Sequence, residues 1–195
     1  MCIGQWNESR VRRDMQDELQ SFLEAPTVGN YRRVREVLLE ELSSPPCASE
    51  LAEMAAASTA GDHVAVLDRM DDLMPAWSLS PRLHFYAALA AERLGDAELA
   101  DLERFVFQAC LEGLLATGEG TADSPYLITY LSDEYDLLTA LGLEPRSQSL
   151  VDRRGLLCDV VKCLDGEEVW FELTGLVHDP RQRQVEFAVL SSLRR

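Results

Sequence analysis

Apolar side chains recur every three or four residues along the first 116 positions, which is the spacing of one buried face of an α-helix. In the first such segment the apolar stripe comprises Val11, Met15, Leu19, Phe22 and Leu23. The periodicity and the glycine and proline breaks predict six helices, at 8–24, 30–42, 48–60, 62–74, 81–94 and 96–116. Proline lacks a backbone N–H and restricts the residue before it, so Pro75 is expected to end the fourth helix.

Two of these helix pairs are joined in the same way, 34 residues apart. Gly61-Asp62 and Gly95-Asp96 each lie between two helical segments, where glycine closes one helix and aspartate caps the next. Gly29-Asn30-Tyr31 occupies a comparable place. Residues 29–116 therefore resemble tetratricopeptide repeats and are expected to stack as about three helical hairpins; an irregular helical bundle is the alternative. The bulky positions of that repeat hold small residues here, namely Ala87, Ala88 and Ala91.

A loop is expected at residues 116–125, which read ATGEGTADSP. It has no lysine, and it carries Glu119 and Asp123, which would repel a phosphate. We therefore interpret it as a connector and not as a nucleotide-binding loop. It divides the chain into a helical region, 1–116, and a small α+β module, 117–195.

The module is expected to contain both strands and one helix. Short strands are predicted at 125–130 and 146–151, with a helix between them that Ser132 caps and Gly142 ends. Segment 184–190 is expected to add a strand, with a helix as the alternative. The predicted fold class is α+β and predominantly α, with tetratricopeptide-like hairpins before a small α/β module.

The clearest strand signal is a β-hairpin at 156–173, in which two β-rich runs flank Asp165-Gly166. A two-residue turn there sets Asp159 opposite Glu172, on the same sheet face as Val161 and Trp170. Two like charges in that position need an arginine or another cation to offset them. The favoured role of the two acids is structural, and the alternatives are partner binding and a metal or acid–base site.

Residues 118–173 resemble a bacterial domain family of unknown function. The resemblance lies in the order of many short elements: Gly118, Gly120, Ser124, Tyr126, Glu134-Tyr135, Gly142-Leu143, Gln148-Ser149-Leu150, Asp159 and Trp170-Phe171-Glu172. Family members often carry Asp or Asn where Glu172 stands. The resemblance implies a helical region followed by this small module, and it implies no established activity.

Aromatic residues gather in the same module. Tyr126, Tyr130 and Tyr135, with Trp170 and Phe171, are expected to form a small core between helix and hairpin. The alternative is that they form a peptide-binding surface.

The charge of the chain narrows the choice of partner. With 34 acidic and 18 basic residues, the net charge is −16, which argues against nucleic acid and against an anionic membrane surface. The five cysteines contain no C-x-x-C pair, and the three histidines lack metal-ligand spacing, so we expect no metal or cofactor. No signal peptide or membrane span is recognisable, which favours the cytoplasm.

These observations favour a non-catalytic protein-binding or scaffold module with a protein partner, for which a basic partner fits the charge. Two alternatives remain: an immunity-type inhibitor of a basic protein, and a cation-dependent enzyme that uses Asp159 and Glu172. No catalytic residue is assigned. The candidate binding residues are Asp159, Glu172, Trp170, Tyr126, Tyr130 and Tyr135.

Overall fold

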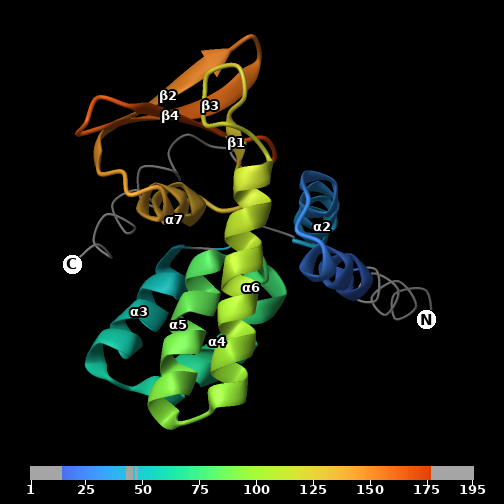
Figure 1. Ribbon diagram of the computed structural model, residues 1–195, viewed down its shortest axis with the longest axis vertical. Coiled ribbons are helices and arrows are strands. Elements are labelled where there is room, and N and C mark those ends of the chain that lie inside the picture. The colour runs from blue at the N-terminus through green and yellow to red at the C-terminus, as the bar shows by residue number, and fades with distance from the viewer. Residues whose placement is uncertain (1–14, 43–45, 47, 177–195) are drawn as a thin grey trace, which may run out of the picture.

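A computed structural model of the chain describes residues 15–42, 46 and 48–176. The fold is α+β and mostly helical, with packed helical hairpins followed by a small mixed sheet (Figure 1). Residues 15–24 form a helix, and the helices α2 to α6 follow it: α2 (Val28–Glu41), α3 (Ala48–Ala60), α4 (His63–Trp77), α5 (Pro81–Leu94) and α6 (Ala97–Ala116). The sheet half comprises β1 (Tyr126–Leu127), α7 (Ser132–Ala140), β2 (Pro145–Arg153), β3 (Leu156–Cys163) and β4 (Glu168–Glu172). The start of the predicted first helix and the predicted strand at 184–190 lie outside the described residues.

The predicted junctions inside the second and third helix pairs, α3–α4 and α5–α6, are confirmed. Gly61 and Gly95 both have positive φ, at 76° and 83°, so each adopts the left-handed conformation that ends a helix. Asp62 and Asp96 then cap α4 and α6 by accepting hydrogen bonds from backbone N–H groups in the first turn, at 3.1 and 3.0 Å. The hairpins α3–α4 and α5–α6 are therefore closed by the same local chemistry.

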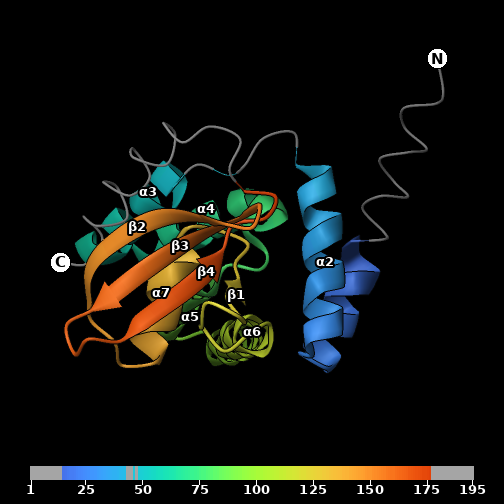
Figure 2. The ribbon, with the colours of Figure 1, turned by 90° about the horizontal axis from the view of Figure 1, so that it is seen from above.

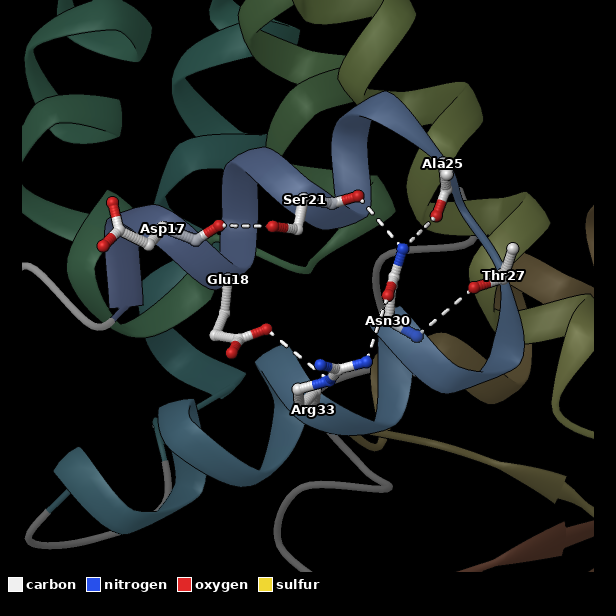
Figure 3. A network of polar contacts seen from close by, with 7 residues as sticks. All are labelled: Asp17, Glu18, Ser21, Ala25, Thr27, Asn30 and Arg33. Carbon is white, nitrogen blue, oxygen red and sulfur yellow. Dashed lines mark hydrogen bonds and ion pairs between the residues drawn. The ribbon is translucent and has the colours of Figure 1, made fainter.

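The first hairpin is closed in a different way, and the prediction of a Gly29-Asn30-Tyr31 junction is wrong. Gly29 lies inside α2, whose N-cap is Thr27. Asn30 closes the hairpin instead, because its Nδ2 donates to the carbonyl oxygens of Ser21 (3.1 Å) and Ala25 (2.9 Å), as Figure 3 shows. A side-chain amide thus satisfies the last carbonyls of the preceding helix, where the later hairpins use glycine.

The helix α4 does not end before Pro75, as predicted, but continues through it to Trp77. Pro75 lies in the last turn, so its missing N–H deprives only one carbonyl near the helix end of a partner. Trp77 is buried, its Nε1 donates to Glu50 of α3 at 2.8 Å, and its ring stacks on Tyr130 at 4.7 Å. These contacts favour the extra turn.

The first hairpin does not extend the row of stacked hairpins. The main helix contact of α2 is with α6, and α6 also contacts α5, α7 and β1. Figure 2 looks nearly along α6 and shows α5 on one side of it and α2 on the other. The close approach depends on Gly113, where an added Cβ would lie 2.6 Å from Phe22 Cε2 and 2.7 Å from Tyr31 Cδ2. The row of stacked hairpins therefore comprises only α3–α6 among the described helices.

We expect Gly113→Ala to lower the free energy of unfolding by about 1–3 kcal/mol, because the new methyl group overpacks two buried rings. Gly29→Ala is the matched control. Its Cβ would meet nothing closer than Thr27 Oγ1 at 4.0 Å, so it is expected to raise stability by up to about 1 kcal/mol. Urea unfolding followed by circular dichroism measures both. Equal effects of the two substitutions would show that Gly113 does not set the helix spacing.

The sheet has the strand order β1-β4-β3-β2, with β1 parallel to β4 and the other pairs antiparallel. Figures 1 and 2 place α7 between the sheet and the helices α3–α5. In the β3–β4 hairpin, Cys163 N–H donates to Glu167 O (2.8 Å) and Gly166 N–H donates to Cys163 O (3.2 Å). Gly166 has a φ of 94°, so the loop is a three-residue turn that ends in a left-handed glycine. The hairpin is confirmed, and the predicted two-residue turn is wrong.

Candidate functional site

The extra loop residue moves Asp159 and Glu172 to opposite faces of the sheet. Asp159 lies opposite Phe171 and Cys158 lies opposite Glu172, one residue away from the predicted register. Since paired residues share a face and neighbours alternate, Asp159 faces inward with Phe171, and Glu172 faces outward. The two acids therefore do not form the common site that the sequence suggested.

Asp159 belongs to a buried polar network in which one glutamine bridges two carboxylates. Nε2 of Gln148 on β2 donates to Oδ2 of Asp159 at 2.6 Å and to Oε2 of Glu134 at 2.7 Å. Tyr135 donates from its hydroxyl group to Oε1 of Gln148 at 3.2 Å. Asp159 and Glu134 are 0 % and 1 % exposed, and Gln148, which bridges them, is partly buried. It ties α7 to two strands of the sheet.

The sequence pattern indicated these residues but not their grouping. Glu134-Tyr135, Gln148 and Asp159 all belong to the family-like pattern, whereas only Asp159 and Tyr135 were singled out as candidates. Gln148 pairs with Val161 across the β2–β3 ladder, which puts its side chain on the same inner face as Asp159. The pairing of β2 with β3 thus brings together Gln148 and Asp159, which are eleven positions apart in the sequence.

We expect Gln148→Met to lower the free energy of unfolding by about 2 kcal/mol, because two buried carboxylates lose a shared donor while the volume stays similar. Ser149→Ala, at the next and exposed position of β2, is the control and is expected to change stability by less than about 0.5 kcal/mol. Thermal unfolding of both variants provides the measurement. A Gln148 variant as stable as the wild type would contradict a bridging role.

The other candidate residues are spread over three places. Trp170 lies on the outer sheet face, with the Arg153 guanidinium 5.8 Å from its ring centre, and Glu172 accepts a hydrogen bond from the Thr174 hydroxyl group at 2.5 Å. Tyr126 is buried beside Phe171, with ring centres 6.1 Å apart. The predicted aromatic residues are therefore divided between the two sheet faces and the junction with the helices.

Tyr130 lies at that junction. Its hydroxyl group donates to the Ala76 carbonyl oxygen at 2.9 Å and accepts from Leu79 N–H at 3.4 Å. Its ring stacks on Trp77. Tyr130 therefore fastens the end of α4 to the segment that precedes α7.

Polar side chains of α2 cross the same junction. Arg35 is 7 % exposed and donates from Nε to Ile128 O at 3.0 Å and from Nη2 to the carbonyl oxygen of Thr174. One turn earlier, Tyr31 Oη lies 2.6 Å from Thr129 Oγ1. The first hairpin is thus hydrogen-bonded to the segment after β1 and to the segment after β4.

Asp133 is the buried acid of this junction. Its Oδ2 accepts backbone hydrogen bonds from Thr129 (2.8 Å) and Tyr130 (2.9 Å), which precede α7. The predicted cap at Ser132 is wrong, because Ser132 lies inside α7 and the N-cap residue, Leu131, makes no side-chain cap hydrogen bond. Burial raises the pKa of Asp133 to about 8, although those two N–H groups and the nearby Arg35 favour the charged form. Tyr31 and Cys110 also lie within electrostatic range of it.

A buried pair of polar side chains, His84 and Glu103, joins α5 to α6. His84 Nδ1 lies 2.6 Å from Glu103 Oε2, and His84 Nε2 lies 3.0 Å from the carbonyl oxygen of Ser78. Each ring nitrogen thus faces an oxygen, so the imidazole links the Glu103 carboxyl group to the Ser78 carbonyl group. His84 and Glu103 are 2 % and 3 % exposed. The pair is therefore a buried ion pair or its neutral equivalent.

Among the residues that the structure describes, the remaining titratable groups do not assemble into a metal site or an exposed nucleophile. In the described part of the chain, no three His, Cys, Asp or Glu side chains gather closely enough to hold a metal ion. Cys110, Cys158 and Cys163 are buried free thiols, and burial raises the pKa of Cys110. Backbone N–H groups of the glycine-rich loop are engaged within it, since Glu119 and Thr121 donate to Ser124 O. That loop is a folded connector.

The surface residues that the sequence analysis missed are large apolar side chains on α5 and α6. Leu102 and Phe105 belong to the apolar positions of their helix, yet they are 53 % and 54 % exposed. Phe85 and Leu94 on α5 are similarly exposed, at 50 % and 48 %. The available signal was the width of the apolar pattern in 96–116, which exceeds what one buried face requires.

No protein-family model, curated protein or solved structure matches the chain. The resemblances to tetratricopeptide repeats and to a bacterial domain family therefore stay predictions. Within residues 15–42 and 48–176, no helix is both long and apolar enough to cross a bilayer.

Proposed function

We propose that the chain is a non-catalytic protein-binding module of the cytoplasm that recognises its partner through the helical half. The observation that carries this proposal is the exposure of Phe85, Leu94, Leu102 and Phe105 on one hairpin, α5–α6. Exposed apolar residues are ordinary when they stand alone, but Leu102 and Phe105 lie three residues apart on one face of α6, as neighbours in an interaction surface would. The free thiols of the three described cysteines fit a reducing compartment.

The charge around these residues supports a basic partner. Exposed acids share the same hairpin, namely Glu92, Asp96, Glu98, Asp101 and Glu112. Together with a net charge of −16, they would attract a basic protein and raise its association rate. An inhibitor of a basic protein is one form of this function.

The structural roles of the buried titratable side chains support binding over catalysis. Asp159, Glu134 and Gln148 join α7 to the sheet, and His84 with Glu103 joins α5 to α6. An enzyme built on Asp159 and Glu172 would need both acids on one face, and the register separates them. The buried residues named above are engaged in contacts that hold neighbouring elements together.

Affinity capture tests the proposal, with the tagged full-length chain in an extract of its source cell. The wild type is expected to retain one protein in stoichiometric amount. A variant with serine at Phe85, Leu94, Leu102 and Phe105 is expected to lose it. The control carries Leu150→Ser and Leu164→Ser, which remove exposed apolar side chains of the sheet half, and it should retain the partner. Absence of a stoichiometric partner, or loss only in the control, would refute the proposal.

A further inference from the structure

An open groove of about 340 Å³ runs between the helix at 15–24 and α6. Its wall is almost entirely apolar, and it is lined by Gln16, Leu19, Gln20, Leu23, Glu24 and Phe105. A groove this open does not enclose a small molecule, but it admits side chains that project from another helix.

The groove follows from the way the first helix packs. Phe22 is buried against Gly113, where the absence of a side chain lets the two helices come close. Phe105 lies eight residues earlier on α6, about 12 Å along its axis, and its bulky ring is half exposed. Leu19 and Leu23 pack partly against the core and present their remaining surface to the groove. The wall formed by Leu19 and Leu23 is therefore held by the core, and Phe105 of α6 forms the opposite wall.

Acids border this apolar strip. Glu24 lines the groove itself, and Glu98 and Glu112 stand seven residues before and after Phe105 on α6, so all three α6 residues share one helix face. The nearest basic residue of α6, Arg104, is already paired with Asp101 (2.9 Å) and with Glu92. The border is thus acidic on both helices.

We propose that this groove binds one amphipathic, basic helix of a partner protein. The apolar stripe of that helix packs on Phe105 and Leu19, and its flanking lysine and arginine residues pair with Glu24, Glu98 and Glu112. This inference rests on the proposed protein-binding function and assigns to it a site and a partner chemistry. Charge complementarity selects a basic helix over a neutral or acidic one.

The probe is a synthetic helical peptide with leucine at positions i, i+3, i+4 and i+7 and lysine and arginine on both flanks. Fluorescence anisotropy with the full-length chain is expected to show saturable binding. Phe105→Ser is expected to weaken it at least about ten-fold, as loss of a central apolar anchor does. Leu164→Ser is the control, because Leu164 is an exposed apolar residue of the sheet half that lies outside the groove, and it should leave the affinity unchanged.

A second comparison tests the charge of the peptide flanks. The same peptide with glutamate on its flanks is expected to bind at least about ten-fold more weakly, and Glu98→Lys with Glu112→Lys should reverse that preference. Methyl resonances of Leu19 and Leu23 are expected to shift during the titration. No saturable binding, equal losses for Leu164→Ser and Phe105→Ser, or equal affinity for both peptides would overturn the proposal.

Two further outcomes separate this inference from the proposed function. If a stoichiometric partner is captured and Phe105→Ser still retains it, the groove is refuted and protein binding stands. If the chain alone sediments as a dimer that Phe105→Ser dissociates, the groove belongs to a second copy and the basic-helix proposal is refuted.

Discussion

Asp133→Asn is expected to flatten the dependence of the unfolding free energy on pH between about pH 4 and pH 8. The pKa of this carboxyl group rises from 3.8 to about 8 on folding, so within this window the folded protein holds a proton that the unfolded chain has lost. Stability therefore falls as the pH rises, by about 1.4 kcal/mol per pH unit from this group, and levels off above pH 8. Asparagine keeps the acceptor for Thr129 and Tyr130 N–H but cannot ionise.

Urea unfolding at a series of pH values measures this effect. The wild-type and Asp133→Asn profiles are expected to diverge progressively from pH 4 to pH 8, with the variant the more stable at the upper end. Burial also raises the pKa of Asp136, so the difference between the two profiles is informative and the slope of either alone is not. Asp71→Asn, at an exposed position of α4, should reproduce the wild-type slope. Parallel profiles for wild type and Asp133→Asn would contradict the buried neutral acid.

His84→Leu is expected to lower the free energy of unfolding by about 3–5 kcal/mol, because it leaves the Glu103 carboxylate buried without its partner. Glu103→Leu leaves a buried ring nitrogen unpaired and is expected to cost about 1–3 kcal/mol. The double variant replaces both groups by apolar side chains, so it should recover most of the loss. Removing one member of the pair is thus expected to lower the free energy of unfolding more than replacing both members.

A double-mutant cycle separates this coupling from the general cost of each substitution. Its matched control is the surface pair of Arg104 and Glu92 on the same two helices, whose side chains are 48 % and 60 % exposed. The coupling energy is expected to exceed about 2 kcal/mol for the buried pair and to stay below about 0.5 kcal/mol for the exposed pair. Equal coupling in the two cycles would show that burial does not set the strength of the His84–Glu103 contact.

The helix ends that could be predicted are those that depend on neighbouring residues. Gly61-Asp62 and Gly95-Asp96 specify a helix end and the next helix start within a few residues, and both are confirmed. Pro75 was misread because its effect depends on how far the helix continues, and buried contacts of Trp77 add that last turn. Local signals fail where distant packing decides between two permitted conformations.

Register and burial were less predictable for the same reason. Asp165-Gly166 suits a two-residue turn, yet it also suits the end of a three-residue turn, and one residue is enough to reverse the faces of every side chain in β4. The bridge between Glu134 and Asp159 depends on Gln148, which only the assembled β2–β3 ladder brings near. The groove at Phe105 depends on the docking of the first hairpin against α6, which no periodicity in the sequence encodes.

The hydrogen bond from Arg35 to Thr174 has a consequence for the growing chain. Its donor and acceptor are separated by 139 positions, so the acceptor leaves the ribosome long after the donor. Until then the guanidinium group of Arg35 lacks this carbonyl as a hydrogen-bond acceptor, so the contacts of the first hairpin with the sheet half are incomplete. We expect the contacts between the first hairpin and the sheet half to be completed only after Thr174 has been synthesised, with α3–α6 ordering earlier.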